Sequence, residues 1–211
     1  MTNKPLVIDI YHGDPITDFQ AVKDSGIVGT IHKAYEAGVP DKFYASRRKA
    51  FTDIGMKWGA YCFFHGRDKG GDPIKEADAF LTMAEPDADT LIALDWETDE
   101  SGYVPHMDEA KAFLYRIAEK LNRKAVVYSG NVAKEKIIGS DLFLGSHRLW
   151  LAQYGAHWST QASWERPWLW QNNGDNTGPG PHHIPGVSGL CDNNTVVSPM
   201  TVDDLLGQWA T

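Results

Sequence analysis

The chain has 211 residues and a formal net charge of −8 at pH 7, with 28 acidic and 20 basic side chains. The Lys and Arg residues are scattered apart from the short group 47–49, which argues against a nucleic-acid-binding groove. No apolar run approaches the roughly 20 residues that span a bilayer, which argues against membrane insertion. The length suffices for one well-buried core, and we expect a single domain over residues 1–211 and a monomer.

The N-terminus and the two cysteines indicate the compartment. Residues 1–5 lead into a short strand, without the apolar stretch and cleavage site of a secretory signal. Cys62 and Cys191 lie far apart in apolar contexts, so we expect buried free thiols, with a disulfide as the alternative. The sequence therefore predicts synthesis in the cytoplasm without a signal peptide.

Strand and helix patterns alternate along most of the chain. In chain order, the patterns predict a strand at 5–11, a helix at 18–25, a strand at 27–33, a helix at 41–54, a strand at 57–64, a helix at 72–84, a strand at 91–97, a helix at 107–121 and a strand at 124–129. After a helical pattern at 131–138, only loops rich in Trp and Gly join the strand-like segments 149–154, 168–171 and 186–192. The alternation predicts a parallel sheet with helical crossovers, which closes most simply into an α/β barrel.

The fourth strand of this order ends in two acids, Asp95 and Glu97. Successive side chains in a strand alternate faces, so the two acids share one face while Trp96 points the other way. Two neighbouring carboxyls allow one to stay protonated while the other stays ionised, which is the chemistry of glycosidic bond cleavage. A strand end that meets solvent is the alternative, and the motif alone does not decide between the two.

Two further strands bring acids of their own. Asp9 lies inside the apolar run 5–11, and Asp192 ends the strand-like segment 186–192. A lone Asp in such a run is costly to bury unless it is paired or functional, although each could instead cap a turn. Acids at three separate strand ends favour convergence on one pocket.

Several motifs in a fixed order carry a resemblance to a known family. They are 7–9, 33–38 with Asp41 and Phe43, 59–64, 94–97, 128–129, 149–154, 170–171, and 186–192 with Asn194. With these motifs the chain resembles the family-25 glycoside hydrolases, lysozymes of the N-acetylmuramidase type found in phages, bacteria and fungi. The resemblance covers nearly the whole chain and implies an irregular, TIM-like (β/α)5(β)3 barrel with its cleft at the carboxyl ends of the strands.

The resemblance also implies roles for the four acids. Glu97 corresponds to the acid that protonates the leaving oxygen, Asp95 to its ionised partner, and Asp9 and Asp192 to the rest of an acidic cleft floor. The substrate would be peptidoglycan glycan strands, cut at the β-1,4 bond between N-acetylmuramic acid and N-acetylglucosamine with retention of configuration. The nucleophile is left open between an enzyme carboxylate and the N-acetyl group of the substrate. No cofactor and no metal are expected.

Further residues are expected to contact the substrate or to support the acids. The expected substrate-binding side chains are Tyr61, Tyr128, Tyr154, Trp170, Gln171 and Lys33. Most tryptophans of the C-terminal third are expected in the barrel wall, whereas Trp170, beside Gln171 at a strand end, is placed in the cleft. Lys33 and Glu36 are expected to form an ion pair, either supporting Asp9 or merely lying on the surface.

The chain departs from the family pattern at the edges of the cleft. Cys62 stands where the family usually has His, and residues 10–13 replace the usual Ser and Gln-Gly. His65 follows two Phe later, but positions 62 and 65 face opposite ways on a regular strand, so it is no simple replacement. Since all four acids remain, we expect hydrolysis to survive with a changed cleft wall or pH range.

Two other classes of protein remain open as alternatives. One is a glycan-binding or phage structural barrel that has lost turnover, and the other is a metal-dependent barrel hydrolase that chelators would inhibit. The order of the motifs along the whole chain favours the muramidase. A muramidase without a signal peptide fits a phage endolysin or a delivered enzyme that acts on the cell wall.

Overall fold

The computed structural model describes residues 4–68, 71–174 and 176–211. Its strands are β1 (Val7–Ile10), β2 (Gly29–Glu36), β3 (Val39–Pro40), β4 (Lys57–Phe63), β5 (Leu91–Asp95), β6 (Val126–Ser129), β7 (Leu149–Ala152), β8 (Leu169–Asn173) and β9 (Asp192–Thr195). Its helices are α1 (Phe19–Asp24), α2 (Tyr44–Asp53), α3 (Pro73–Ala84), α4 (Met107–Leu121), α5 (Asn131–Lys136), α6 (Leu142–Gly145) and α7 (Val202–Gly207). Among these residues, no helix has the length and apolar character needed to cross a membrane.

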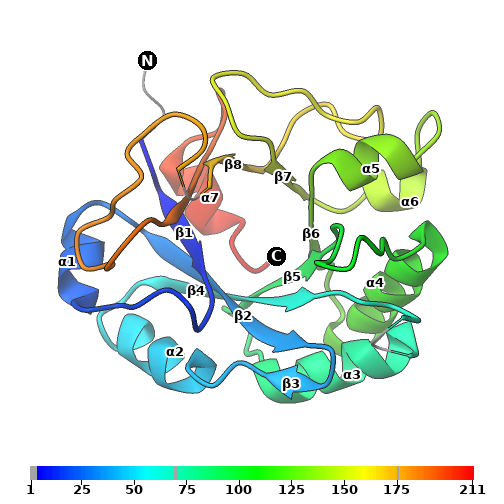
Figure 1. Cartoon of the computed structure of the whole chain (residues 1–211), viewed down its shortest axis with the longest axis horizontal. Coiled ribbons are helices and arrows are strands. Elements are labelled where there is room, and N and C mark those ends of the chain that lie inside the picture. The colour runs from blue at the N-terminus through cyan, green and yellow to red at the C-terminus, as the bar shows by residue number, and fades with distance from the viewer. Residues whose placement is uncertain (1–3, 69–70, 175) are drawn as a thin grey trace.

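The strands close into a barrel. Their order is β1-β9-β8-β7-β6-β5-β4-β2, and a parallel pairing of β1 with β2 completes the ring. Neighbouring strands run parallel except β9, which is antiparallel to both β1 and β8, while the two-residue β3 only extends the edge at the end of β2. Helices α1 to α5 lie around the outside (Figure 1). The predicted barrel of five strand-helix units followed by three strands is confirmed.

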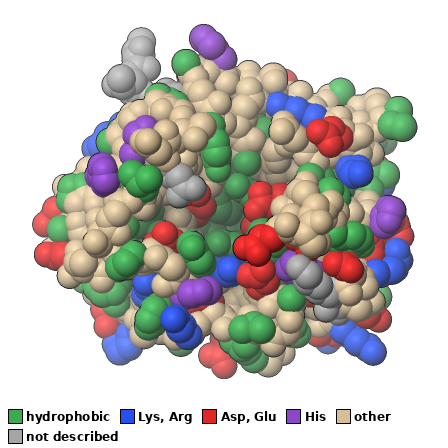
Figure 2. Space-filling model, viewed as in Figure 1, with side chains coloured by type: hydrophobic (Ala, Val, Ile, Leu, Met, Phe, Trp, Pro, Cys, Tyr) green, Lys and Arg blue, Asp and Glu red, His purple; other side chains and the backbone are tan. Residues whose placement is uncertain are grey.

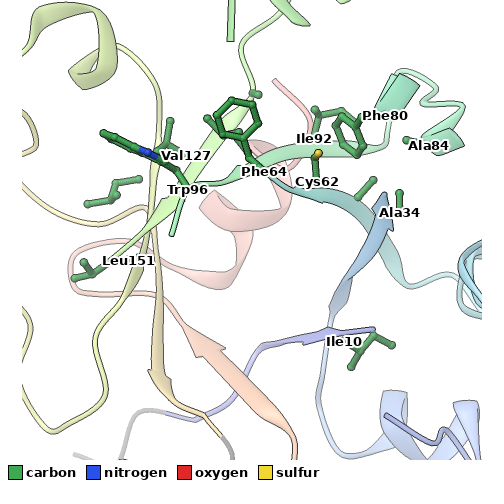
Figure 3. Close-up of a cluster of buried hydrophobic side chains, with 14 of the residues drawn as sticks. Ile10, Ala34, Cys62, Phe64, Phe80, Ala84, Ile92, Trp96, Val127 and Leu151 are labelled. Carbon is green, nitrogen blue, oxygen red and sulfur yellow. The ribbon is translucent and has the colours of Figure 1, made fainter. Parts of the chain in front are cut away.

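Strands β1, β2, β4, β5 and β6 bury both of their faces. Val7, Ile31, Leu91, Ala93 and Val126 belong to a cluster inside the barrel. The alternate residues pack outward against the helices, among them Ile10, Cys62, Ile92, Trp96 and Val127 (Figure 3). Burial on both faces explains why these strands are nearly continuous apolar runs in the sequence.

Both cysteines lie in the outer layer. Cys62 and Cys191 are free thiols that are 0% and 2% exposed. Cys62 is next to Tyr61 on β4, and the strand turns the two side chains to opposite faces. The predicted pair of buried free thiols is confirmed.

Helix α7 closes the amino-terminal end of the barrel. Trp209, just beyond this helix, is 1% exposed and donates a hydrogen bond from Nε1 to the Trp58 carbonyl at 2.7 Å. A Cβ on Gly29 would lie 2.6 Å from the Trp209 ring, so only glycine fits there. With this end filled by apolar side chains, a cleft has room only at the carboxyl ends of the strands.

The last barrel strand differs from the sequence expectation. Residues 186–191 form turns and irregular backbone, and β9 begins at Asp192 instead of ending there. The predicted strand at 186–192 is therefore wrong. Because β9 runs antiparallel to β1, its first residue lies at the same barrel end as the last residues of β1, and Asp192 pairs with Asp9. Asp192 therefore lies at the expected end of the barrel, although it begins an antiparallel strand and does not end a parallel one.

Candidate active site

Four acids gather at the open end of the barrel. Asp9 on β1, Asp95 at the end of β5 and Asp192 at the start of β9 all face inward, above the inner apolar cluster. Glu97 lies two residues beyond β5, where the strand-like backbone continues through a hydrogen bond from Trp96 N–H to the Tyr128 carbonyl at 2.9 Å. Figure 2 shows acidic side chains around a hollow near the centre of this view.

Two side-chain amides hold Asp9. Its Oδ1 accepts a hydrogen bond from Gln171 Nε2 at 2.9 Å, and its Oδ2 accepts one from Asn194 Nδ2 at 2.6 Å. Gln171 Nε2 also lies 3.3 Å from Asp192 Oδ2, so a single amide bridges two carboxyls. These donors fix the positions of two acids that would otherwise repel each other.

A second layer of bonds fixes those amides in turn. Tyr128 donates its hydroxyl to Gln171 Oε1 at 2.8 Å, and Trp150 donates its Nε1 to Asn194 Oδ1 at 2.6 Å. Gln171 is only 1% exposed and its amide is occupied by protein groups. The structure therefore places Gln171 beneath the acids as their support, not on an open surface where a sugar would lie.

Asn194 and Trp150 were missed as site residues by sequence reasoning. Asn194 appeared only as part of a motif, although it stands two residues after Asp192 and so shares its face on a strand. That spacing was the available signal. No sequence signal pointed to Trp150, because a tryptophan in an apolar run cannot be told from an ordinary core residue until the hydrogen-bond partner of its indole is known.

The crowded carboxyls have raised pKa values. Burial, followed by repulsion from Asp192, raises the pKa of Asp9 well above its usual range, although its two amide donors oppose the rise. Burial raises the pKa of Asp95 as well, with contributions from Glu97 and Asp9. Burial and the charge of Asp192 raise the pKa of Glu97 to about 7. The site therefore retains at least one carboxyl proton near neutral pH.

Lys33 is the cation beside this cluster. Its Nζ lies 2.6 Å from Glu36 Oε2, so the expected ion pair is present, and it also lies 4.9 Å from the centre of the Tyr11 ring. Its positive charge lowers the pKa of Asp95, against the larger effect of burial. A register shift between Lys33 and Tyr35 marks a β-bulge in β2, a device that often re-aims side chains beside active sites.

A cavity opens beside Glu97. Its volume is about 480 Å³, and its lining includes Glu97, Thr98, Tyr128, Gly130, Gln153 and Tyr154. Tyr154 is 45% exposed at the rim, and Gly174 leaves room for its ring, because a Cβ there would lie 2.4 Å from the Tyr154 hydroxyl. The volume lies within the range of small-molecule sites, and Glu97 forms part of the cavity wall.

Tyr61 and Trp170 were also expected to bind the substrate, but only Tyr61 faces the cleft. Tyr61 on β4 faces inward, and the charges of Asp95 and Asp9 add to burial in raising its pKa. Trp170, by contrast, packs in the outer cluster, is 2% exposed and donates its Nε1 to the Gln153 carbonyl at 2.8 Å. Placing Trp170 in the cleft was wrong. Gln171 faces inward, so its neighbour on the strand must face outward.

This combination of a barrel, a cavity and crowded carboxyls is typical of glycoside hydrolases. The model of the glycosyl hydrolases family 25 matches residues 8–180, and the chain belongs to this family. A curated relative, the autolytic lysozyme of Clostridium acetobutylicum, is 29% identical over 154 residues, which cover 70% of this chain and 44% of the relative. The chain thus spans less than half the length of that protein.

Solved structures share the fold. The bacterial lysozyme from Streptomyces coelicolor superimposes with a TM-score of 0.79 at 20% identity, over 100% of this chain and 99% of that one. The CTP1L endolysin gives a TM-score of 0.70 at 25% identity, over 91% of this chain and 66% of that one. These similarities agree with the barrel described above.

Proposed function

We propose that the chain is a lysozyme-type peptidoglycan hydrolase. It cleaves the β-1,4 bond between N-acetylmuramic acid and N-acetylglucosamine, with Glu97 as general acid and Asp95 as the ionised partner. Membership of family 25 and the similarity to an autolytic lysozyme support the class of substrate. The glycan strand is the partner, no cofactor takes part, and the enzyme works on the cell wall as a monomer with one catalytic domain.

The position and pKa of Glu97 carry this proposal. Its carboxyl lines the cavity, and a pKa of about 7 keeps much of it protonated at neutral pH. A general acid works best when its pKa lies near the working pH. Glu97 donates its proton to the glycosidic oxygen as the bond to the sugar carbon breaks, and then accepts a proton from the incoming water.

Asp95 supplies the negative charge that the reaction needs. Positive charge develops on the sugar ring as the leaving group departs, and a nearby carboxylate stabilises it. Lys33 favours the ionised form of Asp95, while repulsion among Asp95, Asp9 and Glu97 keeps the remaining proton in the cluster. Tyr128 and Tyr154 line the cavity, and we propose that these two side chains and Tyr61 contact the sugars.

Replacement of Glu97 by Gln tests the proposal. Glu97→Gln keeps the size of the side chain and removes the proton donor, so turnover of purified peptidoglycan should fall about 10²- to 10⁴-fold or more. Glu100→Gln is the matched control, because Glu100 is an exposed acid on the same loop and should leave turnover unchanged. Mass analysis of the digest identifies the reducing sugar of the products.

Two results would contradict the proposal, and a third would favour the alternative function. More than a tenth of wild-type activity in Glu97→Gln would remove Glu97 from its role. Products that end in reducing N-acetylglucosamine would contradict the proposed bond. Binding of glycan without any product from the wild-type protein would instead support the glycan-binding barrel.

A further inference from the structure

His65 lies between two carboxylates beside the active site. It follows the end of β4, and its side chain is 2% exposed. Its Nε2 lies 3.3 Å from Glu36 Oε1, and its Nδ1 lies at an ion-pair distance of 3.4 Å from Asp99 Oδ2. The ring of Phe63 packs against it, with ring centres 5.2 Å apart. The mechanism proposed above assigns no task to this buried, titratable ring.

Each carboxylate neighbour of His65 is connected to one of the two acids that we propose to be catalytic. Glu36 uses its other oxygen to bind Lys33 Nζ at 2.6 Å, and Lys33 acts electrostatically on Asp95. Asp99 stands two residues after Glu97 and accepts backbone hydrogen bonds on Oδ1 from Ser101 at 2.8 Å and from Tyr103 at 2.9 Å. Asp99 therefore shapes the loop that carries the general acid.

The backbone of His65 is itself held by buried carboxyls. Glu76 of α3 accepts from the N–H of His65 at 3.1 Å and from the N–H of Gly66 at 2.9 Å. Glu109 of α4 accepts from the N–H of Arg67 at 2.9 Å. Helices of the outer layer thus fix the backbone of the loop that carries the imidazole.

We propose that His65 is a positioning residue of the active site, which anchors Glu36 so that Lys33 stays beside Asp95 and which ties the Glu97 loop to β4 through Asp99. The proposal rests on the function proposed above.

The charges around the ring determine the expected effect. Glu36 and Lys33 face it from β2, Asp99 faces it from the loop after β5, and the carboxyls of Glu76 and Glu109 bind the backbone on either side. The ring is hydrogen-bonded to Glu36 through Nε2, whereas its Nδ1 lies near Asp99 at an ion-pair distance without a hydrogen bond among the described residues. Loss of the ring releases Glu36 and weakens the hold on Lys33, so Asp95 is harder to ionise.

The test compares pH profiles of peptidoglycan hydrolysis. In His65→Leu the acidic limb, which reports ionisation of the Asp95 partner, should move up by about 1 pH unit, and kcat should fall roughly 10-fold with KM unchanged. The alkaline limb should stay, because burial and Asp192 set the pKa of Glu97. His65→Gln, which restores one donor, should recover part of the shift.

Two further variants complete the design. His147→Leu is the matched control: this other buried histidine is 3% exposed and bonds to the Ala125 carbonyl at 2.9 Å, near the amino end of the barrel. It should not move either limb, even where stability falls. Lys33→Met removes the positive charge that lowers the pKa of Asp95, so its acidic limb should move up, in the same direction as in His65→Leu.

These results can overturn the proposal separately from the proposed function. An acidic limb of His65→Leu at the wild-type pH, or an equal shift in His147→Leu, would refute the positioning role. If His65→Leu does not fold, an unmoved acidic limb in Lys33→Met would do the same, because the position of Lys33 would then have no effect on Asp95. Failure of Glu97→Gln to abolish activity would refute the proposed function itself, whatever the His65 variants do.

Discussion

The cleft carboxyls differ in the groups that surround each of them. Asp9 accepts two amide hydrogen bonds, whereas Asp95 has one buried oxygen, Oδ1, without a hydrogen-bond partner among the described residues. Glu97 lies in the cavity wall, and Asp192 is the charged neighbour that raises its pKa. Four acids of similar chemistry can thus take different roles, because burial, hydrogen bonds and neighbouring charges differ at each.

Removal of the charge on Asp192 should change the working pH range. The negative charge of Asp192 raises the pKa of Glu97, so Asp192→Asn should lower it and move the alkaline limb of the activity profile down by roughly half a unit to one unit. Asn keeps an oxygen that still accepts from Gln171, so the scaffold of the site is retained. The measurement is kcat/KM between pH 4 and 9 on solubilised glycan strands.

Asp9→Asn is the comparison for that experiment. Asp9 is absent from the charges that raise the pKa of Glu97, so its replacement should shift the alkaline limb less than Asp192→Asn does. Equal shifts in both variants, or none in Asp192→Asn, would show that Asp192 does not control the proton of Glu97.

At the scale of elements, strand parity was the most useful sequence signal. Alternation predicts that Asp95 and Glu97 share a face. The same rule turns Cys62 away from its neighbour Tyr61, and the barrel has Cys62 in its outer layer. The same rule, applied to Gln171, would have turned Trp170 outward. That error came from weighing the chemistry of an aromatic ring above the geometry of its strand.

Strand β9 lay beyond the reach of hydrophobic patterns. Its four residues, Asp192–Thr195, are all polar, so neither alternation nor an apolar run marks them as a barrel strand. The last three are nevertheless buried, and partners across the barrel bind the polar side chain at the centre of the strand: Asn194 binds Asp9, Trp150 and the Val7 carbonyl. A strand stabilised by such pairing is visible only once its neighbours are known.

The reactivity of the two cysteines tests whether their side chains point outward from the barrel and are buried there. Burial raises the pKa of both the Cys62 and Cys191 thiols well above the usual value, so little thiolate forms in the native protein. A thiol reagent should label them roughly 100-fold or more slowly than in denaturant, where it should count two thiols. Activity should not respond to dithiothreitol. A count of zero without reductant would contradict the assigned parity.

On the scale of the whole molecule, the barrel separates stability from chemistry. Its amino-terminal end is filled by Trp209, Trp168 and Leu205, while its carboxyl end holds crowded acids and polar scaffolding. Raised carboxyl pKa values mean that ionisation of the site opposes folding, so the apolar end must offset this cost. Changes at the closed end should therefore alter the free energy of unfolding and leave the site intact.

The contact between Gly29 and Trp209 allows this separation to be measured. Gly29→Ala places a methyl group 2.6 Å from the indole and should cost about 1–3 kcal/mol of unfolding free energy, and Trp209→Ala should cost about 3–5 kcal/mol through a cavity and a lost hydrogen bond. In the double variant the methyl group enters the cavity, so the second substitution should cost little, which gives a clear coupling energy in denaturant titrations. The initial hydrolysis rate per folded molecule, measured well below each melting temperature, should match wild type in all three variants. Additive losses of stability, or a rate that falls with stability, would show that the closed end does not act as an independent support for the open one.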